Sequence, residues 1–208
     1  QLGRTMNSSR PPTFFSNIQH PKDINDLNVE NFLYYAKVIS DFFRLWGTRF
    51  YLVRADVDGN ISKVWNASIH LQITSLKDML SREQALGTYM KDSSGSIGLL
   101  WLIRTYNFLI CVLWHLSQST SQDSMRTILL SAYEESLAKY HNSLMHGTFK
   151  LVLRTLPKRS LFIKKLACDQ DICEQIVLQD AADLVLSMRP FIAHLQDLLR
   201  AYQLETIS

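Results

Sequence analysis

The chain has 208 residues, 47% of them hydrophobic, so it is long enough to bury a sizeable core within one compact domain. Its 22 basic and 19 acidic residues give a net charge of +3, without the basic runs that are typical of nucleic-acid binders. This composition argues against a nucleic-acid partner and allows weak attraction to an anionic membrane surface.

Three cysteines, Cys111, Cys168 and Cys173, form an odd set without nearby histidines, so we expect no zinc site and a reducing compartment. The opening residues, QLGRTMNSSRPP, are polar and lack the order of a signal peptide, which predicts a cytoplasmic protein. We expect an irregular lead-in over residues 1–27 and the folded domain over residues 28–208.

Glycine and proline are sparse, with seven and five residues, which favours helices over many short strands. Apolar residues at helical spacing predict a first helix in NVENFLYYAKVISDFFRLWG, ended by Gly47. A second helix is predicted from about Phe50 to Ala67. A third is predicted over SLKDMLSREQALGTYM, before the loop composition of KDSSGS.

The next segment, IGLLWLIRTYNFLICVLWHL, is apolar at fifteen of twenty positions and has Arg104 near its middle. A central arginine costs roughly 2.5–3.5 kcal/mol in a membrane, so we expect the core helix of a soluble bundle. Further helices are predicted over residues 125–156, from Pro157, and over residues 171–203, where Pro190 should kink or divide the helix. The sequence therefore predicts an all-α protein of about seven or eight helices.

The stretch RADVDGNISKVWNA has Asp56, Asp58 and Asn60 at the spacing of the first ligands in a calcium loop. The glycine comes one position early and the bidentate Glu is missing, which argues against a metal site. On a helix, Asp56, Asn60 and Lys63 share one face and Asp58 points elsewhere. That face could bind a polyhydroxylated group such as a sugar. A solvated charged face is the alternative.

Three motifs resemble the glycolipid transfer protein family in the family's own order. ADVDGNISK is similar to its headgroup-binding helix, whose pattern is Asp, three residues, Asn, two residues, Lys. LLWLIR resembles its tryptophan-bearing central helix, and AYEESLAKYH resembles its segment ending in Tyr-His. The resemblance runs from about Asn31 to the C-terminus, and it implies a glycolipid transfer protein domain over residues 28–208. The implied fold is a two-layer sandwich of about eight helices around an apolar lipid tunnel.

The resemblance also implies a set of site residues. Asp56, Asn60 and Lys63 would bond the headgroup, with Asp56 also near the ceramide amide. Trp101 would stack beneath the first sugar, whose C–H groups form an apolar face. His141 would bond the amide carbonyl of the ceramide. Taken singly, Trp101 and His141 could equally be ordinary core residues.

A branch of the family that carries ceramide phosphate has a basic residue at the position of Asn60 and an arginine at that of Trp101, because phosphate takes charge-assisted hydrogen bonds. Asn60 and Trp101 therefore favour a neutral glycosphingolipid. Arg104, one helical turn beyond Trp101, is close enough to assist an anionic group. Ceramide 1-phosphate transfer, or lipid sensing in the same fold, is the alternative.

A carrier must enclose both lipid chains, because each exposed methylene costs about 0.8 kcal/mol. Apolar residues on the predicted helices are candidates to line such a tunnel, and ordinary core is their other possible role. The candidates are Phe42, Phe108, Cys111, Val112, Leu144, Phe149, Val152 and Phe191.

Membrane contact has its own candidates. Ser143 occupies the place where family members commonly carry a tryptophan, and an aromatic contact from the tail before LETIS would have to come from Tyr202. The segment PKRSLFIKKL suits weak interfacial docking, with a solvated helix face as the alternative. Its relevant residues are Lys158, Arg159, Lys164 and Lys165 around Leu161 and Phe162.

No G-x-S-x-G elbow, H-E-x-x-H helix or phosphate-binding glycine loop occurs, so the sequence predicts no enzyme, cofactor or metal site. An acid/base pair of Asp56 and His141 acting on a lipid ester is the enzymatic alternative. We expect a monomer that binds a glycosphingolipid, contacts membranes transiently, and transfers the lipid between them without chemical change.

Overall fold

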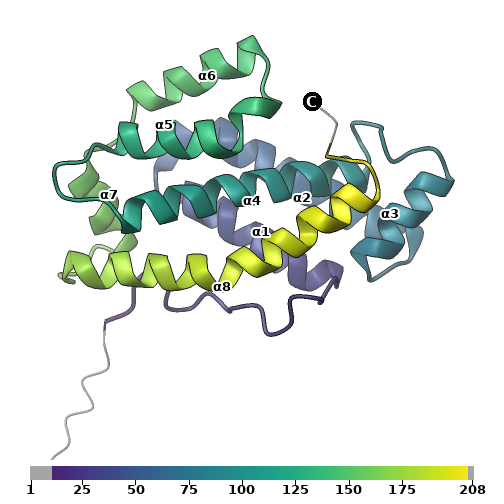
Figure 1. Ribbon diagram of the computed structural model, residues 1–208, viewed down its shortest axis with the longest axis horizontal. Helices are drawn as coiled ribbons and strands as arrows, with labels where there is room; N and C mark the ends of the chain where they lie inside the picture. The colour runs from purple at the N-terminus through teal and green to yellow at the C-terminus, as the bar shows by residue number, and fades with distance from the viewer. Residues whose placement is uncertain (1–10, 206–208) are drawn as a thin grey trace, which may run out of the picture.

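The computed structural model describes residues 11–205, which form eight α-helices and two short 3-10 helices without a β-strand (Figure 1). In chain order these are α1 (Val29–Arg44), η1 (Gly47–Phe50), α2 (Tyr51–Leu71), α3 (Leu76–Ala85), α4 (Gly95–Ser117), α5 (Met125–Ser136), η2 (Ala138–Tyr140), α6 (Ser143–Arg154), α7 (Arg159–Leu166) and α8 (Glu174–Ala201). The start of the predicted lead-in and the end of LETIS lie outside the described residues. The predicted all-α class is confirmed for residues 11–205.

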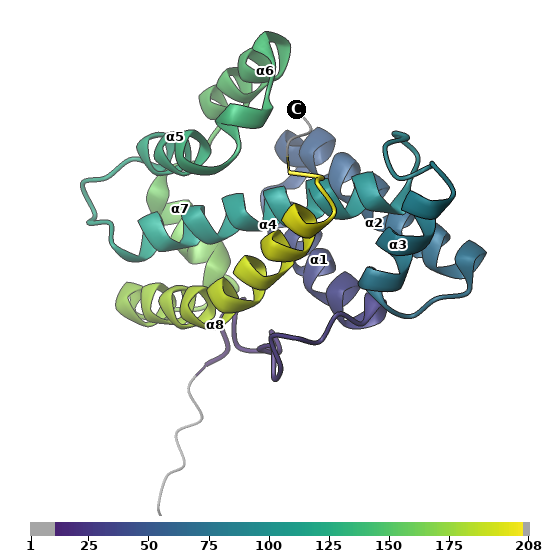
Figure 2. The same ribbon diagram turned by 45° about the vertical axis from the view of Figure 1, so that its right-hand side comes forward.

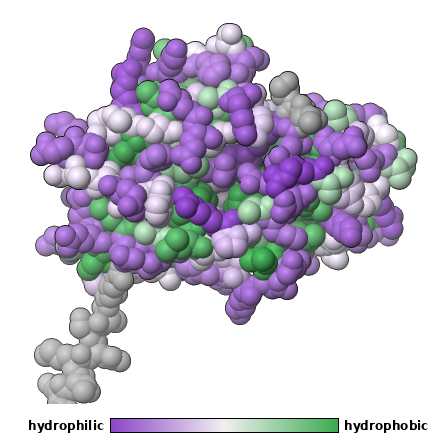
Figure 3. All heavy atoms as spheres, in the orientation of Figure 1, coloured by the Kyte–Doolittle hydropathy of each residue, from purple (hydrophilic) through white to green (hydrophobic). Residues whose placement is uncertain are grey.

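Helix α4 lies at the centre of the fold and packs against α2, α5 and α8. Figures 1 and 2 show α4, α5 and α8 in one layer, with α1 and α2 behind it. By length and composition α4 could cross a membrane, but 83% of that apolar window is buried inside the protein. A helix that is apolar on all sides needs neighbours on all sides. Polar residues cover most of the face in Figure 3. Because α4 is mostly buried inside the protein, the prediction of a core helix is confirmed.

The ends of the first three helices differ from the prediction where the backbone turns. Helix α1 ends at Arg44, three residues before Gly47, which adopts a left-handed φ of 68° and begins η1. Helix α2 continues to Leu71 and ends where Gln72 takes a left-handed φ of 52°. Helix α3 is shorter than predicted and ends at Ala85.

Two glycines on α4 let this helix approach its neighbours closely. A Cβ on Gly98 would lie 2.8 Å from the backbone oxygen of Asn60 and 2.9 Å from the Cβ of Lys63. A Cβ on Gly95 would lie 2.6 Å from the Cβ of Ala67. Close-packed interiors have little room for such atoms, so these glycines fix the spacing between α2 and α4.

A buried carboxylate from α3 caps the N-terminus of α4. Glu83 accepts hydrogen bonds from the backbone N–H groups of Gly95 (2.8 Å) and Ser96 (2.7 Å) and from the Ser96 hydroxyl (2.5 Å). The hydroxyl of Ser94 accepts from the backbone N–H of Ile97 at 3.1 Å. These bonds satisfy amides that have no partner within the helix, and the carboxylate complements the positive helix end.

Helix α8 continues through Pro190 and is not divided. Figure 1 shows it bending near its middle, as expected for a proline that lacks a backbone donor and crowds the preceding turn. The end of α8 is fastened to α3, because the hydroxyl oxygens of Tyr202 and Ser81 lie 2.6 Å apart. Tyr202 is therefore placed as a structural contact between these helices.

Residues 11–27 contain no helix and pack against the C-terminal part of the chain. The Thr13 hydroxyl donates to the Asp180 carboxylate on α8 at 2.7 Å, and the backbone N–H of Phe14 donates to the carbonyl of Leu166 on α7 at 2.8 Å. Phe15 is buried in the hydrophobic core. This segment therefore joins α7 and α8 to the rest of the fold.

Candidate functional site

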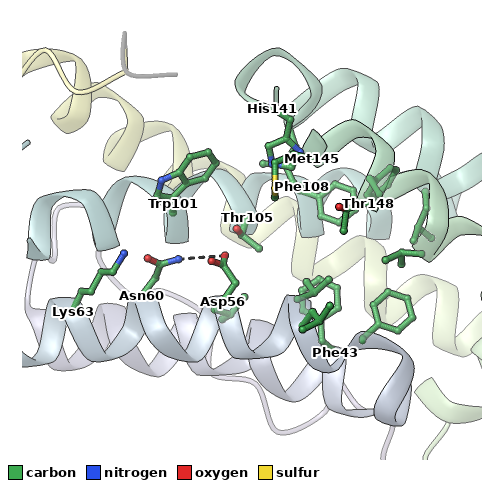
Figure 4. A pocket seen from close by; sticks show the side chains of 18 of the residues that line it. Phe43, Asp56, Asn60, Lys63, Trp101, Thr105, Phe108, His141, Met145 and Thr148 are labelled. Atoms are coloured by element: carbon green, nitrogen blue, oxygen red, sulfur yellow. Dashed lines mark hydrogen bonds between the residues drawn. The ribbon is translucent and has the colours of Figure 1, made fainter. Parts of the chain in front are cut away.

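A cavity of about 290 Å³ lies between α2 on one side and α4, α5 and α6 on the other. Figure 4 shows Lys63, Asn60 and Asp56 in turn along α2, with apolar side chains such as Phe43 and Phe108 beyond them. The lining residues are Phe43, Phe50, Leu52, Val53, Asp56, Val57, Asn60, Lys63, Asp92, Trp101, Thr105, Phe108, Leu129, Leu137, His141, Met145, Thr148, Phe149 and Val152. A largely apolar cavity with one polar end suits an amphiphilic ligand.

The polar residues of α2 project from one face of the helix into this cavity. Asn60 is only 4% exposed, and its amide donates to Oδ2 of Asp56 at 3.3 Å. Burial raises the pKa of Asp56 above its ordinary value, while nearby Lys63 opposes this shift. Asp58 points elsewhere and accepts a hydrogen bond from the Ser40 hydroxyl at 2.6 Å. All of these α2 positions lie inside a continuous helix rather than a calcium loop.

Trp101 on α4 lies opposite the polar face of α2, and His141, which follows η2, lies beside it (Figure 4). Their ring centroids are 6.1 Å apart, with 36° between the ring planes. Burial lowers the pKa of His141, so its imidazole is neutral at pH 7. The Tyr133 hydroxyl lies 2.9 Å from Nδ1 of His141, so this ring nitrogen has a hydrogen-bond partner within the protein.

A second histidine shares the same hydroxyl. Nδ1 of His146 on α6 also lies 2.9 Å from the oxygen of Tyr133. A hydroxyl carries one proton, so Tyr133 donates to one histidine and accepts from the other. The sequence motif indicated His141 but neither of these partners, because they meet only when α5 and α6 pack together.

Arg104 supports Trp101 and does not line the cavity. Its guanidinium carbon lies 4.9 Å from the centroid of the Trp101 ring and 3.6 Å from that of Tyr140. Its Nη2 donates to the backbone oxygen of Glu205 at 3.3 Å. Burial lowers the pKa of this guanidinium, which stays charged at neutral pH. Arg104 therefore contacts the Trp101 indole by a cation–π interaction, and its expected role of assisting a headgroup stays a prediction.

Of the predicted chain-lining residues, Phe108, Phe149 and Val152 line the cavity. Leu144 is instead 77% exposed at the surface. The other candidates are buried in the core and do not line the cavity; they are Phe42, Cys111, Val112 and Phe191. Helical periodicity identifies a buried face, but it cannot distinguish a face that meets another helix from one that meets a cavity.

The cavity wall also contains residues that the motifs did not indicate. Thr105 lies one turn after Trp101, so helical spacing from Trp101 could have identified it. Asp92 comes from the loop before α4, and its Oδ1 lies 3.4 Å from Nζ of Lys63. Met145 comes from α6. The positions of these last two depend on tertiary packing, which carries no local sequence signal.

The predicted basic docking cluster does not form one surface. Arg159 is buried and donates to the Glu174 carboxylate at 2.6 Å. Phe162 is also buried and stacks on Trp46, with ring centroids 3.7 Å apart. This corrects the expectation, because α7 turns these two side chains inward. The remaining members, Lys158, Leu161, Lys164 and Lys165, lie at or near the surface.

An all-α fold around a largely apolar cavity with one polar end is suited to binding an amphiphilic lipid. The model of the glycolipid transfer protein (GLTP) family matches residues 27–168, and the chain belongs to this family. Glycolipid transfer protein 3 of Arabidopsis thaliana is 26% identical over 188 residues, 89% of this chain and 79% of that protein. The glycolipid transfer protein of Danio rerio is 24% identical over 177 residues, 81% of this chain and 84% of that protein.

Solved structures from two branches share the fold. The structure that shows how FAPP2 selects simple glycosphingolipids using the GLTP fold is 27% identical, has a TM-score of 0.81, and covers 94% of this chain and 98% of that one. The structure of human ceramide-1-phosphate transfer protein with 12:0 ceramide-1-phosphate is 18% identical and has a TM-score of 0.77. The match covers 87% of this chain and 90% of that one. The family and fold expected from the motifs are confirmed, and the protein is a lipid transfer protein rather than an enzyme.

Proposed function

We propose that this protein binds a neutral glycosphingolipid by its headgroup and ceramide and carries it between membranes without chemical change. The observation behind this proposal is that Trp101, a stacking surface, lies opposite a carboxylate, an amide and an ammonium group (Figure 4). A sugar matches both walls, because its C–H face stacks on an indole and its hydroxyls both donate and accept.

A phosphate headgroup matches this site less well. It has no C–H face and takes charged donors, whereas this chain has Asn60 and Trp101 at the two positions that are basic in the ceramide-phosphate branch. FAPP2, which selects simple glycosphingolipids, is also 27% identical to this chain. In this proposal Nε2 of His141 meets the ceramide amide, and the apolar end of the cavity receives the lipid chains.

Loading two chains requires more room than the present cavity offers. Its volume of about 290 Å³ is just below the roughly 300–1,000 Å³ that is usual for ligand pockets. Helix α6 forms one wall, and within it Leu153 is the one residue that is buried. We infer that α6 moves outward as the chains enter.

The mouth of the cavity has an apolar rim, defined here as Tyr51, Leu52, Leu144 and Met145. Leu52 and Met145 line the cavity and are nevertheless exposed, and Tyr51 and Leu144 are their exposed neighbours. We propose that this rim touches membranes transiently and takes the place of the tryptophan that Ser143 replaces. A monomer in the cytoplasm is the form we expect to act.

Vesicle-to-vesicle transfer tests the function. The protein should move labelled galactosylceramide to acceptor vesicles intact, and faster than it moves labelled ceramide 1-phosphate. Trp101→Ala should lower galactosylceramide transfer by about tenfold, because an aromatic contact contributes about 0.5–1.5 kcal/mol beyond the area it buries.

The matched control is Trp65→Ala, since Trp65 is an exposed tryptophan of α2 that does not line this cavity. Its transfer rate should equal that of the wild type. Faster transfer of ceramide 1-phosphate, or full activity in Trp101→Ala, would contradict the neutral-headgroup proposal. A cleaved product would indicate chemistry, and binding without transfer would indicate a sensor.

A further inference from the structure

Asp92 brings a second carboxylate to the polar end of the cavity. It belongs to the loop between α3 and α4 and lines the cavity three positions before Gly95, where α4 begins. Its Oδ1 lies 3.4 Å from Nζ of Lys63, and its side chain is 95% exposed. Asp92 therefore lies at the solvent-exposed edge of the polar end, where the outer part of a headgroup would project into water.

The ionisable side chains that line the polar end of the cavity carry a net negative charge when both carboxylates are ionised. Asp56 and Asp92 are acidic, Lys63 is basic, and burial keeps His141 neutral by lowering its pKa. With both carboxylates ionised, the balance is one negative charge. Asp92 is also close enough to Asp56 to add to the rise in its pKa that burial causes.

Apart from Lys63, the nearby cations lie outside the described lining of the cavity, although the charge of Arg104 acts on His141. Among the described residues that line the cavity, Lys63 is the one lysine or arginine. The guanidinium of Arg104 lies over the Tyr140 ring and outside the wall. Lys91 precedes Asp92 in the loop but does not line the cavity. An anion that enters this end meets a single ammonium group that already faces two acids.

We propose that Asp92 is a specificity-determining residue, whose carboxylate accepts hydrogen bonds from an uncharged sugar headgroup and repels a phosphate or sulfate headgroup. This inference rests on the proposed function, in which the headgroup occupies this end. A hydroxyl donates to a carboxylate in a charge-assisted bond. A phosphate monoester carries about −1.5 to −2 charges at neutral pH, and Asp92 repels it while Lys63 supplies the single lysine or arginine charge in the described lining.

The test measures the transfer of two labelled lipids, galactosylceramide and ceramide 1-phosphate, between phosphatidylcholine vesicles. Asp92→Asn keeps the size of the side chain and removes its charge. The ratio of ceramide 1-phosphate to galactosylceramide transfer should rise about fivefold at low salt, as expected for two exposed charges near contact distance. At high salt the increase should shrink, because ions screen charges at an exposed opening.

Asp171→Asn is the matched control, because it makes the same change in net charge at an exposed loop residue outside the cavity. The ratio should stay at its wild-type value in this variant. An unchanged ratio in Asp92→Asn, or an equal rise in Asp171→Asn, would overturn the role of Asp92 alone. If the wild type moves neither lipid, or prefers ceramide 1-phosphate, the proposed function itself fails.

Discussion

Gly98 sets the distance between the two walls of the polar end. It lies one turn before Trp101 on α4 and directly against Asn60 and Lys63 on α2. A side chain at position 98 would press on the backbone of the residue whose amide faces the cavity. The position of the Trp101 indole relative to the α2 side chains therefore depends on residue 98 having no side chain.

We predict that Gly98→Ala destabilises the protein by about 1–3 kcal/mol, because overpacking outweighs the helix propensity of alanine. The control is Gly59→Ala on α2, where an added Cβ would meet no atom within 4 Å. That variant should be more stable than wild type by about 0.5–1 kcal/mol. Urea denaturation of both variants measures the difference, and shifts of the same sign would refute the packing role of Gly98.

At the residue scale, helical spacing predicted which polar residues share one face of α2. Asp56, Asn60 and Lys63 could be assigned to one cavity-facing side because helical spacing is a local property. Asp92 and His146 could not be predicted, since their partners Lys63 and Tyr133 lie on other elements. Nothing in the local sequence of KDSSGS distinguishes a cavity residue from an ordinary loop residue.

At the scale of elements, α6 buries fewer of its residues than any other described α-helix. Within it Leu153 is buried, whereas α4 is buried along most of its length. Helices with few buried apolar side chains open at low free energy. We predict that the amides of α6 exchange with deuterium faster than those of α4, and that loading with galactosylceramide slows exchange in α6.

Gly147→Ala provides a sharper form of this measurement. Gly147 lies inside α6, and a Cβ there would meet no atom within 4 Å. The change should stabilise α6 by up to about 1 kcal/mol, which slows its exchange roughly fivefold and leaves α4 unaffected. Exchange in α6 that is as slow as in α4 before loading would contradict the proposed outward movement.

Element boundaries followed the sequence less closely than element types. The apolar composition of α4, together with Arg104 near its middle, predicted a buried core helix, and this prediction is confirmed. The separation of α5 from α6 by η2 was hidden within one continuous prediction over residues 125–156. Neither glycine nor proline marks that junction, and its local signal is Asn142, whose side chain caps α6 by accepting a hydrogen bond from the backbone N–H of Met145 at 3.0 Å.

At the scale of the whole molecule, the rim of Tyr51, Leu52, Leu144 and Met145 joins two elements that are far apart in the chain. We predict that Leu144→Glu lowers vesicle-to-vesicle transfer about tenfold, because inserting a leucine side chain into lipid is favourable by about 1.5–3 kcal/mol. Initial transfer rates and thermal stability should be measured together, and the stability should not change.

Leu186→Glu on α8 is the control, since Leu186 is 59% exposed and does not line the cavity. Its transfer rate should match that of the wild type. An equal loss in both variants would mean that charge anywhere on the surface hinders docking, and the rim would have no special role.

The cap on α4 has a consequence for the chemistry that this fold can select. The start of a helix presents free backbone amides and a positive dipole, which together make a ready site for phosphate. Here that site adjoins the polar end of the cavity and is already filled by Glu83, a carboxylate from the chain itself. Because Glu83 occupies these amides, a phosphate headgroup cannot use them. Any selection between headgroups then depends on cavity side chains, and these can be substituted without changing the start of α4.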